Sequence, residues 1–259
     1  MKSKEGFVKN GSASSLVRGL RVLECFGQQK HHRFTLSKLA RVLNMPKSSI
    51  YRVLKTLSQM DYLRYEEHSK HYYLGVRVLS LGFALLEGME LREIARPYME
   101  KLSHECNKTV NLAVLDRDEM VYVERISVQS IRSYNISVGT RMPLWNSAIG
   151  RAVLAHLETP IIAQMMKKAK KDGVFTENER RFMKTLADER QNGFAVSNQE
   201  QRTGILAIAV PLFSSKGVTG AINLVAEVED MSFDVLKRDY APKLMKVGNQ
   251  MSEALGYRD

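Results

Sequence analysis

Side chains that can bind nucleic acid are concentrated in one short segment of the sequence, residues 47–56. They are Lys47, Ser48, Ser49, Tyr51, Arg52, Lys55 and Thr56. Arginine can donate two parallel hydrogen bonds to a guanine edge, whereas lysine and hydroxyl groups commonly contact phosphates. We therefore predict a DNA-contacting surface in which Arg52 reads a base and Lys47 and Lys55 contact phosphates. Tyr51 has a second interpretation as a packing residue, and the sequence leaves both open.

A helix must carry these side chains, and the surrounding apolar residues predict two short ones. The apolar positions are Leu36, Leu39, Ala40 and Leu43 in the first segment and Ile50, Val53, Leu54 and Leu57 in the second. Both sets follow the spacing i, i+3, i+4, i+7, which places each set on one helix face. Pro46 separates the two, because proline is tolerated in a first turn but not in a helix interior. The pattern is typical of a helix-turn-helix.

Two further segments complete the predicted N-terminal domain, residues 14–75. A helix over residues 16–26 brings Leu16, Leu20, Leu23 and Phe26 to one side, as a third wall of a small core. Residues 62–65 and 71–74 read as strands joined by a polar turn, where Lys70 is another candidate DNA contact. A hairpin directly after the second helix predicts the wing of a winged helix.

The charge is unevenly distributed in a way that favours a nucleic-acid partner for the N-terminal third. The net charge is +11, and residues 1–90 carry 15 Lys/Arg against 7 Asp/Glu, a net +8. Residues 91–259 carry 24 against 21, a net +3. A basic excess beside a helix-turn-helix is what phosphate neutralisation requires. We expect residues 1–13 to be a disordered basic arm, not a secretory signal.

The composition also restricts the class of protein. No apolar run approaches the roughly 20 residues of a membrane span. The sequence has 2 cysteines, Cys25 and Cys106, too few for a disulfide framework, so we expect a cytoplasmic protein. Residues 76–86 are apolar almost all round, which indicates a linker helix, within residues 76–90, that packs against another element or a second subunit.

The remainder, residues 91–257, alternates predicted strands and helices. Strands are expected at residues 109–116, 120–126, 131–138, 194–197, 205–213 and 218–226, and helices at 91–102, 147–156, 161–171, 180–190 and from 236 onward. Pro242 must kink the last helix or mark a later start. Strands in hairpins with helices grouped around them indicate an α+β domain with an antiparallel sheet.

Other residues that could do chemistry give weak signals. His104 and Cys106 lack a second pair of metal ligands, so we expect core residues and no metal site. Glu200 has no partner nucleophile, which favours an orienting or structural role. Lys167, Lys168, Lys170 and Lys171 read as a solvated helix face. Arg132 and Arg141 could hold a carboxylate or lie on the surface.

At residues 15–255 the sequence resembles the IclR family of bacterial transcriptional regulators. The Leu-Asn-Met-Pro-Lys-Ser-Ser turn at residues 43–49 and the segment MPLWNSAIGRAVLA at residues 142–155 are similar to family segments. The family signature is matched by Gly193, Ser197, Glu200, Ala207, Ile208, Ala209, Leu212 and Phe213. Ser214, Trp145 and Asn146 depart from the usual residues, the last two at positions that concern effector choice.

The resemblance implies a winged helix-turn-helix joined by a linker helix to a GAF-like effector-binding domain, in a homodimer or dimer of dimers. Carried over one by one, the family's pocket positions fall on Ile131, Ala148, Ile149, Ser197, Ala207, Asn223 and Val225. Most are apolar, which fits a small ligand held by a few hydrogen bonds. We also expect exposed N–H groups at the start of the Ser147 helix to accept a carboxylate.

The expected function is therefore a ligand-responsive regulator, by default a repressor of a catabolic operon. It would bind double-stranded operator DNA and an organic, aromatic or sugar acid, use no cofactor and catalyse no reaction. Two other classes stay open: a GAF-like small-molecule enzyme, and an architectural DNA-binding protein without an effector. Residues 91–259 offer Cys106 alone as a cysteine nucleophile, within a helical stripe, which does not favour the enzyme.

Overall fold

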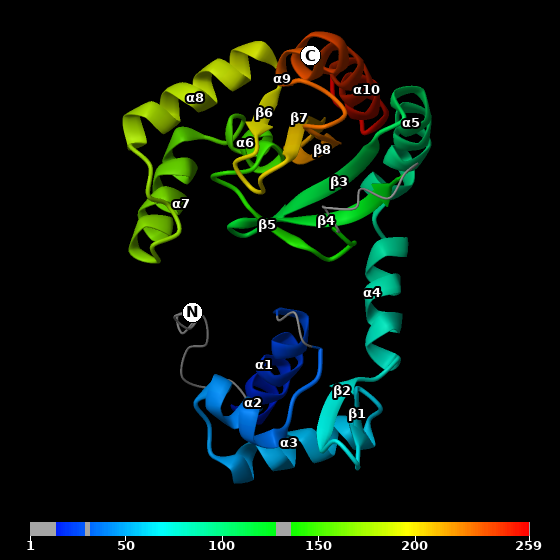
Figure 1. Ribbon diagram of the computed structural model, residues 1–259, viewed down its shortest axis with the longest axis vertical. Coiled ribbons are helices and arrows are strands. Elements are labelled where there is room, and N and C mark those ends of the chain that lie inside the picture. The colour runs from blue at the N-terminus through cyan, green and yellow to red at the C-terminus, as the bar shows by residue number, and fades with distance from the viewer. Residues whose placement is uncertain (1–13, 29–31, 128–135, 259) are drawn as a thin grey trace. The chain divides into compact units, whose positions relative to one another are not determined.

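The computed structural model describes residues 14–28, 32–127 and 136–258. Contacts divide the chain into two units, Met1–Gly88 and Met89–Asp259 (Figure 1). The expected arm at residues 1–13, the candidate pocket residue Ile131 and Arg132 lie outside the described residues.

The first unit is a helical domain that carries a hairpin. Its elements are α1 (Ser14–Gln28), α2 (Leu36–Leu43), α3 (Lys47–Gln59), β1 (Leu63–Glu66), β2 (His71–Leu74) and α4 (Arg77–Glu87). Thr35 caps α2 by accepting a hydrogen bond from the Lys38 amide, and Asn44 ends it in the left-handed conformation, with φ 50°. Pro46 stands directly before α3. The predicted helix-turn-helix and its wing are confirmed.

The core of this unit corrects the predicted packing of α1. The buried residues are Val22, Cys25, Phe26, Phe34, Leu39, Ala40, Ile50, Leu54, Leu57, Leu63 and Tyr72. Leu16 and Leu20 are 63% and 52% exposed, so the prediction that they form a core wall is wrong. At 100° per residue Leu16 lies about 120° and Leu20 about 160° around the helix from the buried Val22.

Helix α4 is unusual because none of its residues is buried. Leu79, Leu81, Phe83 and Leu85 are between 53% and 66% exposed in the single chain. Among the described residues, no helix is long and apolar enough to cross a membrane.

The second unit is built on an antiparallel sheet with the strand order β5-β4-β3-β8-β7-β6. The strands are β3 (Thr109–Asp116), β4 (Glu119–Ile126), β5 (Arg141–Pro143), β6 (Ala195–Asn198), β7 (Ile205–Ser214) and β8 (Gly217–Glu227). The α+β class is confirmed. The strand predicted at residues 131–138 is wrong in its described part, because Thr140 donates to the carbonyl of Ser137 in a turn and Gly139 has φ 88°.

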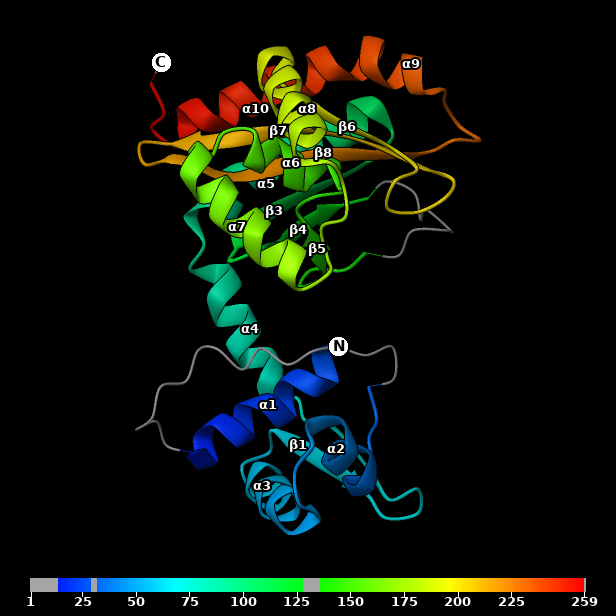
Figure 2. The same cartoon turned by 90° about the vertical axis from the view of Figure 1, so that its left-hand side faces the viewer.

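Helices cover both faces of this sheet (Figure 2). They are α5 (Glu90–Cys106), α6 (Ala148–Leu154), α7 (Thr159–Lys171), α8 (Glu179–Asn192), α9 (Phe233–Val235) and α10 (Ala241–Ala254). Ala209 packs in the core shared with α6, α7 and α8, whereas Val210 meets α10 at Gly248. Successive strand side chains point to opposite faces, so α6 and α10 lie on opposite sides of the sheet. Helix α5 packs beside α10.

The C-terminal helix resolves the ambiguity at Pro242. A π-helical turn, η1 (Leu236–Tyr240), precedes α10, and Pro242 lies in the first turn of α10. That position needs no backbone N–H donor, so the proline marks a later start of the helix.

Candidate DNA-binding surface and candidate ligand pocket

Helix α3 buries one face and presents the other to solvent. Ile50, Leu54 and Leu57 are buried, and the predicted DNA contacts lie on the remaining surface. Lys47, Ser48, Tyr51, Arg52, Lys55 and Thr56 are exposed, and Ser49 is half-buried. Tyr51, at 53% exposure, lies outside the core, so its interpretation as a packing residue is not supported within this unit.

The wing is fixed by contacts that leave Lys70 exposed. Glu66 pairs with Arg33 at 2.9 Å and accepts a hydrogen bond from the Ser69 hydroxyl. That hydrogen bond, followed by the charge of Arg33, holds the pKa of Glu66 below its usual value. Lys70 adopts φ 55° at the turn. The hairpin therefore presents its lysine from an ordered turn.

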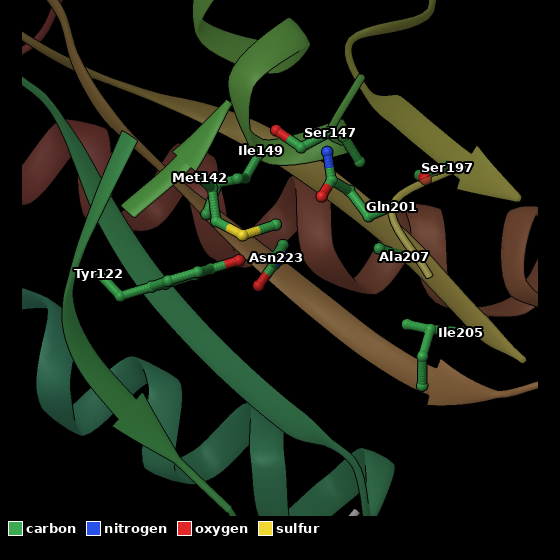
Figure 3. A pocket seen from close by; sticks show the side chains of 10 residues that line it. Tyr122, Met142, Ser147, Ile149, Ser197, Gln201, Ile205, Ala207 and Asn223 are labelled. Atoms are coloured by element: carbon green, nitrogen blue, oxygen red, sulfur yellow. Dashed lines mark hydrogen bonds between the residues drawn. The ribbon is translucent and has the colours of Figure 1, made fainter. Parts of the chain in front are cut away.

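A pocket of about 290 Å³, including its open mouth, lies in the second unit. Its lining residues are Tyr122, Met142, Ser147, Ala148, Ile149, Ser197, Gln201, Ile205, Ala207 and Asn223 (Figure 3). The structure thus brings together five of the seven predicted pocket positions, from α6, β6, β7 and β8. Val225 is buried in the same core but does not line the pocket. Ile131 lies outside the described residues.

A hydrogen-bond network joins one wall of the pocket to the interior of the sheet. Asn223 accepts a hydrogen bond from the side-chain amide of Asn111 at 2.8 Å. It donates to the hydroxyl of Tyr122 at 3.3 Å, and both of these side chains line the pocket (Figure 3). Arg125 donates to the side-chain oxygen Oδ1 of Asn111 at 3.3 Å. Asn111 stands opposite both Asn223 and Arg125 in the strand register. Sequence reasoning missed Asn111 and Tyr122, since cross-strand register is not visible in one strand.

The start of α6, where an anion site is expected, is capped by the side chain of Ser147. Ser147 caps the helix by accepting from the Gly150 amide at 3.1 Å and donates to the carbonyl of Pro143 at 2.5 Å. The first residues of α6 are buried and Ala148 and Ile149 line the pocket, so an anion site at their N–H groups stays a prediction. At Gly150 a methyl group would clash with the backbone of Leu144, which explains why this close approach requires glycine.

A buried arginine behind the pocket was not singled out from the sequence. Arg151 Nε donates to both carboxylate oxygens of Glu189, at 3.0 and 3.2 Å. Its Nη1 donates to Glu200 at 2.6 Å and approaches the Trp145 carbonyl at 3.5 Å. Its Nη2 donates to the Val196 carbonyl. The orienting role expected for Glu200 agrees with this pairing, whose partner lies 49 residues away.

The electrostatics of this cluster favour a lasting ion pair. Burial opposes a charge on Arg151, but Glu189 and Glu200 outweigh it and hold the pKa of Arg151 above its ordinary value. Burial raises the pKa of the Glu189 carboxyl, against the pull of Arg151. The raised pKa of Arg151 favours the charged Arg151–Glu189 pair, whereas the raised pKa of Glu189 favours a neutral carboxyl. The two hydrogen bonds from Arg151 Nε to the Glu189 carboxylate favour the ionised form at neutral pH.

Of the remaining candidates, Cys106 is buried as expected, whereas His104 is exposed, so its prediction as a core residue is wrong. The others lie on the surface. Arg141 pairs with Asp116 and, at 3.1 Å, with Glu119, and does not line the pocket. Lys168 and Lys170 pair with acidic side chains at 2.7 and 2.6 Å, as expected for a solvated helix face. Within residues 14–28, 32–127 and 136–258, no group of at least 3 His, Cys, Asp or Glu side chains could hold a metal.

Two family models match the chain. One describes the IclR helix-turn-helix domain and covers residues 15–67. The other describes the C-terminal domain of the bacterial transcriptional regulator IclR and covers residues 83–253. Together they include both the α3 surface and the pocket.

Similar proteins span nearly the same length. The transcriptional regulator KdgR of Escherichia coli is 29% identical over 254 residues, which cover 96% of this chain and 95% of that protein. The crystal structure of an IclR family regulator from Brucella abortus is 27% identical with a TM-score of 0.80, over 94% and 93% of the chains. An IclR homolog from Microbacterium hydrocarbonoxydans, complexed with 4-hydroxybenzoate, shares the fold at 22% identity, with a TM-score of 0.75 over 93% and 98%.

Proposed function

The chain belongs to the IclR family of bacterial transcriptional regulators, and from that premise we propose that it is a ligand-responsive repressor of a catabolic operon. The observation that carries the DNA-binding part is α3, whose outward face gathers Arg52, Lys55 and Lys47 with hydroxyl side chains. The unit around it carries most of the net positive charge. Residues 14–75 are the DNA-binding part of this proposal, residues 76–90 the linker and residues 91–257 the effector domain.

Helix α3 would lie in the major groove as the recognition helix. Arg52, near its middle, is the proposed base-reading residue, with Ser48, Ser49 and Tyr51 as further contacts from α3. Lys47, Lys55, Thr56 and the wing residue Lys70 would neutralise or donate to phosphates. We therefore expect substitution of a base-contacting residue to change the sequence preference, and substitution of a phosphate-contacting residue to weaken binding to all DNA sequences.

We propose that the chain acts as a homodimer or a dimer of dimers. Exposed apolar side chains that gather on one element are characteristic of interaction surfaces. Helix α4 has no buried residue, and Leu16 and Leu20 of α1 are exposed as well. Association through these residues would bring two copies of α3 to a pseudo-palindromic operator.

The pocket supports a small effector. Met142, Ile149 and Ile205 offer apolar contact, whereas Ser197 and Asn223 offer hydrogen bonds. A small organic acid with a hydrocarbon or aromatic body and polar ends fits this lining. The homolog complexed with 4-hydroxybenzoate supports that class of ligand.

Regulation requires the effector to have different affinities for two arrangements of the chain. An effector bound in the second unit can change operator affinity only to the extent of that difference. We propose that the linker, residues 76–90, connects effector binding in the second unit to operator binding by the first unit. The protein would act in the cytoplasm, where it meets the chromosome.

The test is a comparison of operator and random DNA with Arg52→Ala. Binding sites are first selected by the wild-type chain from a random pool of duplexes, and affinities are then measured by fluorescence anisotropy. We expect Arg52→Ala to weaken operator binding by about 1–3 kcal/mol and to relax the preference at one base position.

Arg180→Ala is the matched control, because Arg180 is an exposed helix arginine in the second unit. It should leave the affinity for the operator unchanged. An equal loss of affinity for operator and random DNA in Arg52→Ala would contradict the base-reading role.

A further inference from the structure

Arg151 connects three segments that line the pocket, which are α6, β6 and the loop that contains Glu200. This residue lies on α6, whose first residues line the pocket. It donates to the carbonyl of Val196, next to the lining residue Ser197. It also pairs with Glu200, next to the lining residue Gln201.

The loop of residues 199–204 is attached at its base and at its tip by separate contacts. At the base, the Gln199 amide donates to Ile205 at 2.9 Å, and the Gly204 amide donates to the Gln199 side chain at 2.9 Å. At the tip, Glu200 pairs with Arg151 at 2.6 Å. The side chain of Gln201 donates across to the Asn146 carbonyl at 3.3 Å, and Figure 3 shows it between Ser197 and Ser147.

The two carboxylates on Arg151 differ in how easily they can leave it. The side chain of Glu189 is 9% exposed, whereas that of Glu200 is 41% exposed. An unpaired Glu189 would be a buried charge, which is strongly unfavourable. Glu200 can exchange Arg151 for water at far lower cost, because it already faces solvent.

We propose that Arg151 is the positioning residue of the pocket and that its ion pair with Glu200 is a releasable latch on the loop of residues 199–204. With the pair formed, Gln201 stands as a wall of the pocket. With it broken, the loop stays attached at Gln199 and Gly204, and its tip keeps only the bonds from Gln201 to the exposed Asn146. Water can replace those bonds, so the tip moves away and opens the pocket. The Arg151–Glu189 pair persists in both states and holds β6 in place.

This inference rests on the proposed function only in taking the pocket as the effector site. Its test uses no ligand and no DNA, so it can succeed or fail independently of the regulator proposal. The measurement is amide hydrogen exchange, read by mass spectrometry on the full chain. The variants are Glu200→Ala, Glu200→Gln and the control Glu179→Ala, which removes an exposed ion pair of the same 2.6 Å length, to Lys170.

We expect exchange in residues 199–204 to become about tenfold faster in Glu200→Ala, while amides of α5 and β8 are unchanged. Glu200→Gln keeps a hydrogen-bond acceptor for Arg151, so exchange should return part of the way to the wild-type rate. Glu179→Ala should not alter this loop. Equal loop exchange in Glu200→Ala and Glu179→Ala would overturn the latch.

Trp145 is the only tryptophan in the sequence. Its fluorescence therefore distinguishes release of the loop from a general loss of structure. Its ring packs on Phe175 and Phe182, at 5.1 and 5.6 Å between ring centroids. Acrylamide quenching of its fluorescence should be the same in Glu200→Ala and the wild type. Faster loop exchange accompanied by stronger quenching would show that Glu200 only supports the core, and would overturn the proposal.

Discussion

His156 should make the second unit less stable as the pH falls from neutral to weakly acidic. The imidazole follows α6 and packs edge-to-face on Phe213, with 5.0 Å between ring centroids. Burial, and to a smaller extent the charge of Arg190, lowers the pKa of His156 from 6.5 to about 4. The folded chain therefore binds fewer protons than the unfolded chain between these two values, so protonation favours unfolding.

The size of the effect follows from that interval. A pKa lowered from 6.5 to about 4 corresponds to at most about 3.4 kcal/mol at 1.36 kcal/mol per pKa unit. The part of the interval between about pH 7 and pH 5 accounts for roughly 2 kcal/mol, and solvent screening of a half-buried ring reduces this to about 1 kcal/mol. Stability from this group is fully present above pH 6.5 and is lost as the pH falls towards 4.

The assay is urea unfolding followed by Trp145 fluorescence, since Trp145 and His156 lie in the same unit. His156→Phe keeps an aromatic ring against Phe213 and removes the titration. We expect the free energy of unfolding to fall by about 1 kcal/mol more in the wild type than in His156→Phe between pH 7 and pH 5. Identical pH slopes for the two proteins would refute the assignment.

Three further predictions concern stability and are checked by chemical unfolding. Gly150→Ala should cost about 1–3 kcal/mol, because the new methyl group meets the backbone of Leu144; an unchanged midpoint of the Trp145 transition would refute this close approach. Asn223→Leu should cost about 1–3 kcal/mol by leaving the buried Asn111 amide without its acceptor, and a neutral effect would mean that the amide pair is unimportant. Phe34→Ala should cost about 3–5 kcal/mol, because Phe34 is fully buried; far-ultraviolet circular dichroism follows the helices of both units, so the part of its transition that is separate from the Trp145 transition reports on this unit, and a loss below 1 kcal/mol would contradict the core assignment.

Local spacing was enough to predict the helix-turn-helix. The apolar residues of α2 and α3 repeat within one or two turns, and Pro46 marks the break between them. Thus both helices, and the outward face that carries Arg52, follow from contacts within a few residues. The burial of Ile50, Leu54 and Leu57 is the direct result of that spacing.

Periodicity was less reliable for α1, where an apolar residue can lie on either of two faces. Leu16 and Leu20 fit a helical stripe, but the core selects the face of Val22, Cys25 and Phe26. Nothing in the sequence of one helix identifies the face that its neighbours cover. The exposure of Leu16 and Leu20 is therefore visible only in the folded unit.

The pocket was predictable in its outline but not in its supporting contacts. Resemblance placed Ala148, Ile149 and Ser197 on its wall, because the order of segments along the chain is preserved. The Arg151–Glu189 pair joins residues 38 positions apart, and Asn111 meets Asn223 across 112 positions. Such pairs depend on how α6 and α8 pack and on strand register, neither of which has a local signature.

The most direct test of the central claim is the specificity ratio of the wild-type chain for DNA. The affinity for the selected duplex is compared with that for random duplex of equal length, at about 150 mM salt, where non-specific phosphate binding is weakened. Base-specific contacts from α3 predict a ratio of at least about a thousand, with a selected sequence made of two related half-sites. A ratio near one would contradict the claim that α3 reads an operator.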